Sequence, residues 1–191
     1  LIPLAPVIFV VAPGLWRNIC PLATTTLLPR HMGLWQEKKL SAKQMGVLNL
    51  IGVIALFIIV PLRHAVFNNS GMATGIMIIT MAAVGIGLGL RYEWKSVWCS
   101  GLCPVHPVEK LYGMNAADAF PNAHCTSCHN CVLPCPDSTP NITPRHATKT
   151  GSHRFSGWLV VAGLPGFIWG WFMVPDHKGM TALFDVITVY L

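Results

Sequence analysis

The chain has 191 residues, of which 53% are hydrophobic and only 10% are charged, so the composition argues against an ordinary soluble domain and predicts a membrane protein. Thirteen Lys and Arg residues against seven Asp and Glu leave a net charge of +6, which lies in the polar segments and does not indicate nucleic acid as a partner. The seven cysteines are an odd number, so a framework made only of disulfide bonds is excluded.

The first segment, 1–44, begins with an apolar stretch over residues 1–12 that is only about half as long as a membrane span. We expect a partial helix there. The basic juxtamembrane part that follows contains Cys20-Pro21, and Trp16 lies four positions before Cys20. Because a cysteine followed by proline is part of the ferredoxin motif, Cys20 is a candidate iron–sulfur ligand.

The second segment, 45–90, contains two apolar stretches, 45–62 and 72–90. Each approaches the roughly 20 residues that a helix needs to cross a hydrocarbon core of about 30 Å. We therefore expect a transmembrane hairpin. Gly85 and Gly89 have the spacing of small residues that lets a neighbouring helix approach closely.

The third segment, 91–155, carries the other six cysteines. A CxxxCP motif follows soon after the second span, and residues 125–136 form a CxxCxxCxxxCP run that is typical of bacterial ferredoxins. In such a run three closely spaced thiolates wrap one cubane, and the fourth points toward a second cluster. The candidate ligands of [4Fe-4S] clusters are therefore Cys125, Cys128, Cys131, Cys135, Cys99, Cys103 and Cys20.

Two other cofactors were weighed for the same run. Cys125, Cys128 and His129 match CxxCH, the attachment site of c-type haem, but that interpretation leaves Cys131 and Cys135 without a role. Structural zinc sites usually group their ligands as two separated pairs rather than as one run. Iron–sulfur ligation is therefore favoured.

The last segment, 156–191, contains a third uncharged stretch of span length, 156–174, in which Pro165 is expected to bend the helix. Gly166 and Gly170 repeat the glycine spacing, and residues 180–191 are again only half a span. The sequence thus predicts an all-α integral membrane helical bundle with three spans, or four to five if the ends continue. A small ferredoxin-like iron–sulfur loop region completes the predicted fold.

Lys and Arg are concentrated in residues 13–44 and 91–155, whereas the connection 63–71 holds only Arg63. Cytoplasmic loops of membrane proteins are enriched in these residues. We therefore expect both large polar segments, with all seven cysteines, to face the cytoplasm from a multi-pass protein of the bacterial cytoplasmic membrane.

Juxtamembrane CxxxCP motifs followed by one ferredoxin run and another span resemble the polyferredoxin-like membrane proteins of the NapH, NosR and CcoG type. The resemblance covers roughly residues 10–175. It implies cytoplasm-facing [4Fe-4S] clusters that serve electron transfer. It also implies that the first three cysteines of the run share a cluster with Cys20 or Cys103, while Cys135, Cys99 and the remaining CP cysteine serve a second.

The family pattern has one cysteine more than the seven present here, since Trp16 stands where the first cysteine of a CxxxCP would be. Asn18, His31, His106, water or a partner residue could complete the second cluster, and two clusters are favoured over one. His106 and Glu109 could take part in proton transfer or contact a quinone head group. We favour instead the solvent-exposed start of a short helix over 108–114.

No catalytic triad, phosphate-binding loop or carboxylate pair is evident, so a non-catalytic subunit is favoured over an enzyme. The leading hypothesis is an electron-transfer subunit of a multi-subunit respiratory or photosynthetic complex. It would pass electrons between a quinone pool or another cofactor and a partner's redox centre. The alternative is an accessory maturation factor that reduces a metal or flavin for another enzyme. Other membrane redox subunits, the lipid bilayer and, as a further candidate, quinone are the expected partners.

Overall fold

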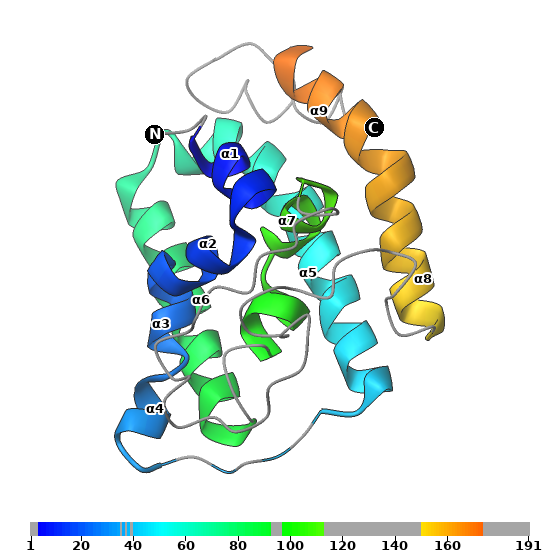
Figure 1. Cartoon of the computed structure of the whole chain (residues 1–191). Coiled ribbons are helices and arrows are strands. Elements are labelled where there is room, and N and C mark those ends of the chain that lie inside the picture. Colours follow the sequence, from blue (N-terminus) through cyan, green and yellow to red (C-terminus); the bar gives the residue numbers. More distant parts are fainter. Residues whose placement is uncertain are drawn as a thin grey trace.

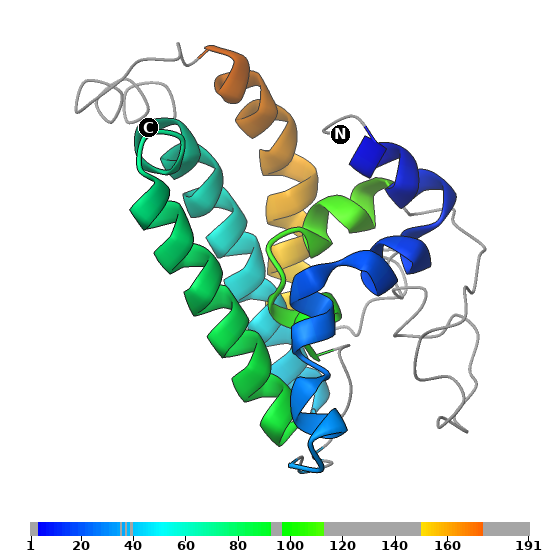
Figure 2. The same cartoon turned by 90° about the vertical axis from the view of Figure 1, so that its left-hand side faces the viewer.

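Two long helices dominate the fold, α5 (Ala42–Leu62) and α6 (Gly71–Arg91), and they diverge from their short connection (Figures 1 and 2). The structure is a computed structural model of the chain, and it describes residues 4–34, 36, 38, 40–92, 97–112 and 150–173. The ordered elements among these residues are helices, and no strand occurs among them.

Serine caps start both long helices. The Ser41 hydroxyl accepts a hydrogen bond from the Gln44 N–H at 3.3 Å, and the Gln44 side chain accepts one from the Ser41 N–H at 3.0 Å. This reciprocal pair is a capping box. The Ser70 hydroxyl likewise accepts from the Ala73 N–H at 3.2 Å. Between the two helices the chain turns through η1 (Arg63–Phe67), so α5 and α6 form the expected hairpin.

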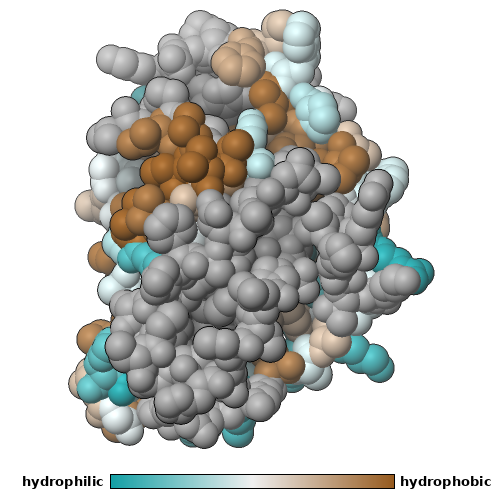
Figure 3. Space-filling model, in the orientation of Figure 1, coloured by the Kyte–Doolittle hydropathy of each residue, from teal (hydrophilic) through white to brown (hydrophobic). Residues whose placement is uncertain are grey.

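The helices α5 and α6 are both long and apolar enough to cross a membrane, so they are candidates for two of the expected spans. Only 33% of the most apolar window of α5 and 11% of that of α6 are buried, whereas a core helix of a soluble protein is mostly buried. Met72 and Ile79 of α6 are 78% and 70% exposed. Figure 3 shows a further concentration of apolar side chains in the upper half of its face. Such surfaces need lipid or another chain to cover them.

The expectation of a third span over 156–174 was wrong for the described residues. This stretch falls into α8 (Gly151–Trp158), η4 (Leu159–Gly163) and α9 (Leu164–Met173), none of which is long enough to be a candidate span. The physical reason is Pro165, which has no N–H to continue the α-helical hydrogen bonding. The chain adopts the wider π-helical pattern just before it, as helices do where the regular pattern is interrupted.

The partial helix expected over residues 1–12 is present as α1 (Leu4–Val11). Three more short helices follow it, α2 (Pro13–Ile19), α3 (Pro21–Thr25) and α4 (Leu28–His31). A proline occupies one of the first two positions of α2, α3 and α4. Because proline fits the first turn of a helix but not its interior, these prolines divide the segment into separate helices. The C-terminal half span, 180–191, lies outside the described residues.

The buried centre of the described residues lies where α3 and α6 meet η2 (Val97–Leu102). Ala23, Trp98 and Cys99 form its fully buried core. The next element, α7 (His106–Tyr112), begins two residues before the expected helix over 108–114. Through η2 and α7, the residues around the CxxxCP motif are packed among the helices rather than extended away from them.

Glycines allow α6 to approach the N-terminal helices. A Cβ atom at Gly89 would overlap the backbone carbonyl oxygen of Thr26, and one at Gly85 would lie 3.1 Å from the Thr26 Cγ2. This confirms the close approach expected at Gly85 and Gly89. At Gly166 a Cβ would meet nothing within 4 Å, so close packing is not seen at that position.

A polar side chain inside α5 ties two other elements to it. Asn49 is 3% exposed, accepts a hydrogen bond from the Ser156 hydroxyl at 2.8 Å and donates one to the Ser100 carbonyl at 3.4 Å. Polar contacts of this kind hold helices together where hydrocarbon offers no alternative partner. Asn49 therefore links α5 to α8 and to η2.

Candidate functional site: a pocket lined by three cysteines

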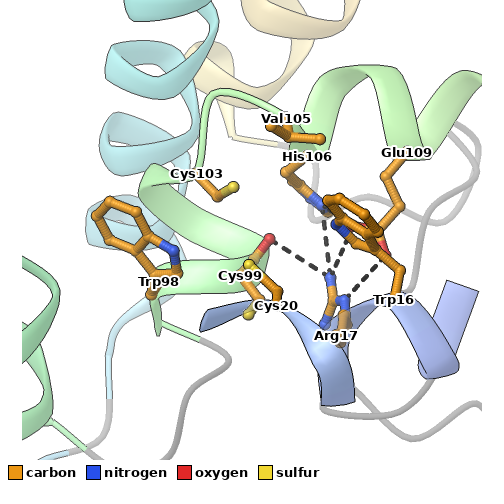
Figure 4. A pocket seen from close by; sticks show the side chains of 9 residues that line it. All are labelled: Trp16, Arg17, Cys20, Trp98, Cys99, Cys103, Val105, His106 and Glu109. Carbon is orange, nitrogen blue, oxygen red and sulfur yellow. Dashed lines mark hydrogen bonds and ion pairs between the residues drawn. The ribbon is translucent and has the colours of Figure 1, made fainter. Parts of the chain in front are cut away.

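Three of the seven candidate ligands meet at one pocket. Cys20, Cys99 and Cys103 come from segments far apart in the sequence, and no disulfide joins them. Figure 4 shows them between α2 and η2. The pocket is lined by Trp16, Arg17, Cys20, Trp98, Cys99, Cys103, Val105, His106 and Glu109. The sequence analysis expected Cys20 and Cys103 to serve different clusters, whereas both line this one pocket.

Both CP motifs stand where one helical element ends and the next begins. The backbone of Cys20 is extended between α2 and α3, and its N–H donates to the Trp16 carbonyl at 2.9 Å. Cys103 follows η2 and donates its N–H to the Trp98 carbonyl at 2.9 Å. Because proline cannot extend the preceding helix, each helix ends at the cysteine before the proline, and the thiol lies at a helix boundary.

The thiols are shielded from water to different degrees. Cys99 is 6% exposed, while Cys20 and Cys103 are half-buried. Burial raises the pKa of Cys103 from 9.0 to about 12, and the nearby Cys20 adds to this effect, whereas the N–H groups of Val105 and His106 oppose it. The Cys103 thiol is therefore protonated at neutral pH, and only a cation bound at the sulfur would release its proton.

A buried ion pair closes one side of the pocket. Arg17 Nε donates to Glu109 Oε1 at 3.0 Å, and His106 Nδ1 lies 3.2 Å from Glu109 Oε2. Burial by itself would raise the pKa of Glu109, but the Arg17 guanidinium and His106 lower it below its usual value. The carboxylate is therefore ionised at neutral pH and is balanced by Arg17.

The same guanidinium reaches the cysteine-bearing segment. Arg17 Nη2 donates to the Ser100 hydroxyl at 3.1 Å and to the Cys99 carbonyl at 3.4 Å (Figure 4). Arg17 thus connects α2, which leads to Cys20, with η2, which carries Cys99. Sequence reasoning missed this role of Arg17, because a single arginine next to Trp16 gives no signal of a partner 92 positions away.

The favoured expectation for His106 and Glu109, a solvent-exposed helix start, was wrong. The two residues are 2% and 3% exposed. The physical reason is that Arg17 of α2 pairs with both, so the first turn of α7 faces the pocket instead of solvent. Among the candidates for the missing ligand, His106 lines the pocket, whereas His31 is exposed at the end of α4.

One hydrogen-bond donor in the pocket has no partner among the described residues. Trp98 is 1% exposed, and its indole Nε1 makes no hydrogen bond to any of them. In Figure 4 this nitrogen lies on the edge of the ring that faces the cysteines. A buried N–H without an acceptor is costly, so this donor indicates an acceptor that belongs to the pocket.

The side chains that line the pocket have a chemistry that suits an iron–sulfur cluster, but the cavity between them is small. Three sulfur donors and an unpaired N–H suit a cluster whose sulfur atoms accept hydrogen bonds. The cavity, however, measures only about 10 Å³, which is room for about one water molecule. Within the part of the chain that the structure describes, no group of three or more His, Cys, Asp or Glu side chains is arranged to hold a metal ion. Binding a cluster would therefore require the pocket to widen and its side chains to rearrange.

The remaining candidate ligands, Cys125, Cys128, Cys131 and Cys135, lie outside the described residues. We found no family model, no curated protein and no solved structure that matches this chain. The resemblance to polyferredoxin-like proteins therefore rests on the cysteine motifs themselves.

Proposed function

We propose that this chain is a membrane-embedded electron-transfer subunit that holds one or two [4Fe-4S] clusters and exchanges electrons with a partner's redox centre. The observation that carries the proposal is the convergence of Cys20 with Cys99 and Cys103 on one pocket. Free cysteines can also be buried as small apolar side chains, but the meeting of two CP motifs from distant segments without a disulfide supports a ligand shared by the sulfurs. The ferredoxin run at 125–136 indicates which ligand that is.

The pocket suggests a different division of ligands from the one implied by the family resemblance. The resemblance assigns Cys20 and Cys103 to different clusters, but both line the same pocket. Since the fourth cysteine of a ferredoxin run serves the neighbouring cluster, Cys135 would complete a set of four thiolates with Cys20, Cys99 and Cys103. The other cluster would then have the first three cysteines of the run and one ligand of another kind.

The cysteines and the ion pair of the pocket each have a role in this proposal. The cluster supplies reversible one-electron chemistry when it is bound. Cys20, Cys99 and Cys103 would hold it, and Cys103 would lose its proton on binding because its pKa is raised to about 12. The buried ion pair of Arg17 and Glu109 joins α2, which leads to Cys20, to α7, which follows Cys103.

Metal analysis of anaerobically purified protein tests the proposal. We expect about eight irons with matching acid-labile sulfide for two clusters, or about four for one, and a cubane signal in electron paramagnetic resonance after reduction. Cys99→Ser should lose the pocket's cluster, and Cys128→Ser should lose the other one. Zinc or haem in place of iron, or thiols without any metal, would show that the proposal is wrong.

Co-purification distinguishes the leading proposal from the maturation factor. The exposed apolar surface of α6, including Met72 and Ile79, can be covered by lipid or by another membrane subunit. A subunit should remain in stable, fixed proportion to a larger redox complex in mild detergent. A chain that is missing from the finished complex, but needed for its assembly, would favour the maturation factor instead.

A further inference from the structure

Trp98 has a position that the proposed function does not yet explain. It is among the largest fully buried side chains, and it belongs to the buried core together with Ala23 and Cys99. Its Nε1–H nevertheless has no acceptor among the described residues. Indole is only a donor, so no rearrangement of its own proton can remove this cost.

The ring is held in one orientation by its surroundings. A Cβ atom at Gly85 would lie 3.8 Å from Cε3 and 3.9 Å from Cδ2 of Trp98, so the benzene side of the indole rests on α6. The opposite edge, which carries Nε1, then faces the cysteines (Figure 4). Packing against a glycine thus directs the donor into the pocket.

The oxygen acceptors around the pocket have other donors. The Cys99 carbonyl and the Ser100 hydroxyl accept from Arg17, and the Glu109 carboxylate is shared by Arg17 and His106. Besides such oxygens, the lining offers the sulfur atoms of Cys20, Cys99 and Cys103 as acceptors. A neutral thiol accepts hydrogen bonds only weakly, whereas a metal-bound thiolate or an inorganic sulfide carries negative charge and accepts them well.

We infer that Trp98 Nε1–H donates a hydrogen bond to a sulfur atom of the cluster held at Cys20, Cys99 and Cys103 and raises the reduction potential of that cluster. Reduction adds an electron and makes the sulfurs more negative, so the hydrogen bond stabilises the reduced form more than the oxidised form. Trp98 is a tuning residue and not a ligand. The inference rests on the proposed function, because it needs a cluster in this pocket.

Trp98→Phe removes the N–H and keeps an aromatic ring in the same place. We expect an unchanged iron content and a lower reduction potential. At a fixed ambient potential the ratio of reduced to oxidised cluster should fall by a factor of about two to ten, as expected for the loss of one ordinary hydrogen bond. Trp158→Phe is the matched control, because Trp158 is 65% exposed and does not line the pocket. Its ratio should stay close to that of the wild type.

A measurement on the wild-type sequence keeps the inference testable if Trp98→Phe fails to bind a cluster. Protein labelled with ¹⁵N only in its indole nitrogens should show a ¹⁵N coupling to the reduced cluster in pulsed electron paramagnetic resonance. The coupled N–H proton should exchange with deuterium. Trp158→Phe should retain the coupling.

The outcomes separate the two proposals. Wild-type protein without iron and sulfide overturns both. Wild-type protein with its clusters but without a ¹⁵N coupling overturns the role of Trp98 alone. A loaded Trp98→Phe protein with the wild-type potential does the same, and it would indicate that a buried water accepts the indole N–H instead.

Discussion

Arg17 is the residue on which the geometry of the cysteine pocket depends most. It is 1% exposed and connects the helix before Cys20 with both Cys99 and Glu109. A buried charge that loses its partner is strongly destabilising, whereas replacing both partners by apolar side chains often is not. The pair can therefore be tested separately from the cluster.

Arg17→Met should lower the free energy of unfolding by about 3–5 kcal/mol, because it leaves the Glu109 carboxylate buried without its cation. The double variant Arg17→Met with Glu109→Leu should recover much of that loss. Denaturant unfolding of the purified protein in detergent measures both. If the two changes simply add, the ion pair does not hold the pocket together.

Cys103 provides a pH-dependent prediction for the cluster-free protein. A pKa of about 12 instead of 9.0 lowers the thiolate fraction at neutral pH by about a thousandfold. Alkylation of Cys103 by iodoacetamide, followed by mass spectrometry, should therefore be slower in the folded than in the urea-unfolded protein by about this factor. The rate in the folded protein should continue to rise with pH above 9.0, where that of an ordinary thiol levels off.

The same shift has a consequence for stability. Between pH 9.0 and about 12 the unfolded thiol loses its proton while the folded one keeps it, so the unfolded state is favoured and stability falls as the pH rises. Equal alkylation rates for the folded and unfolded chains, with no such loss of stability, would contradict the burial of this sulfur.

At the scale of elements, hydropathy located α5 and α6 well, because a long apolar helix needs little other information. The stretch predicted at 72–90 corresponds to the helix Gly71–Arg91. The stretch predicted at 45–62 corresponds to the helix Ala42–Leu62, which begins three residues earlier because Ser41 caps it. Hydropathy failed at 156–174, where the number of apolar residues is sufficient but Pro165 interrupts the hydrogen bonding. It also gave no sign that α7 would face inward, because that depends on Arg17.

The approach of α6 to the N-terminal helices can be tested with two glycines of one helix. Gly89→Ala should be destabilising by about 1–3 kcal/mol, because its Cβ would overlap the Thr26 carbonyl and push α3 and α6 apart. Gly87→Ala is the control, since a Cβ there would meet nothing within 4 Å. Thermal unfolding in detergent compares the two. Equal effects would show that α6 does not pack this closely.

For the whole molecule, the sequence predicted that distant cysteines would meet, and the pocket contains three of the seven. These three can meet because CP motifs mark positions where a helix must end, and such ends can gather at one level of a helical hairpin. The run at 125–136 lies outside the described residues, so its part in the site stays a prediction. The network around Arg17 could not be predicted, because ion pairing between distant segments leaves no local pattern.

The hairpin of α5 and α6 also determines on which side of the membrane the flanking segments of the chain lie. If both helices cross the membrane, the segment before Ala42 and the segment after Arg91 lie on one side and the connection at 63–71 lies on the other. The excess of Lys and Arg predicts that the first pair lies in the cytoplasm. Asn68 lies in the connection and Lys38 lies before α5, and both are exposed. A cysteine at each position therefore tests one side of the membrane.

In intact cells, Asn68→Cys should react with a membrane-impermeant maleimide, whereas Lys38→Cys should react only after the cells are broken. Wild-type protein is the control, because its described cysteines are buried or half-buried and should add little labelling. Labelling of Lys38→Cys in intact cells would reverse the topology, and labelling of both variants there would exclude the spanning hairpin. The first result would place the cysteine pocket, which lies at the junctions of α2, α3 and η2, on the non-cytoplasmic side of the bilayer.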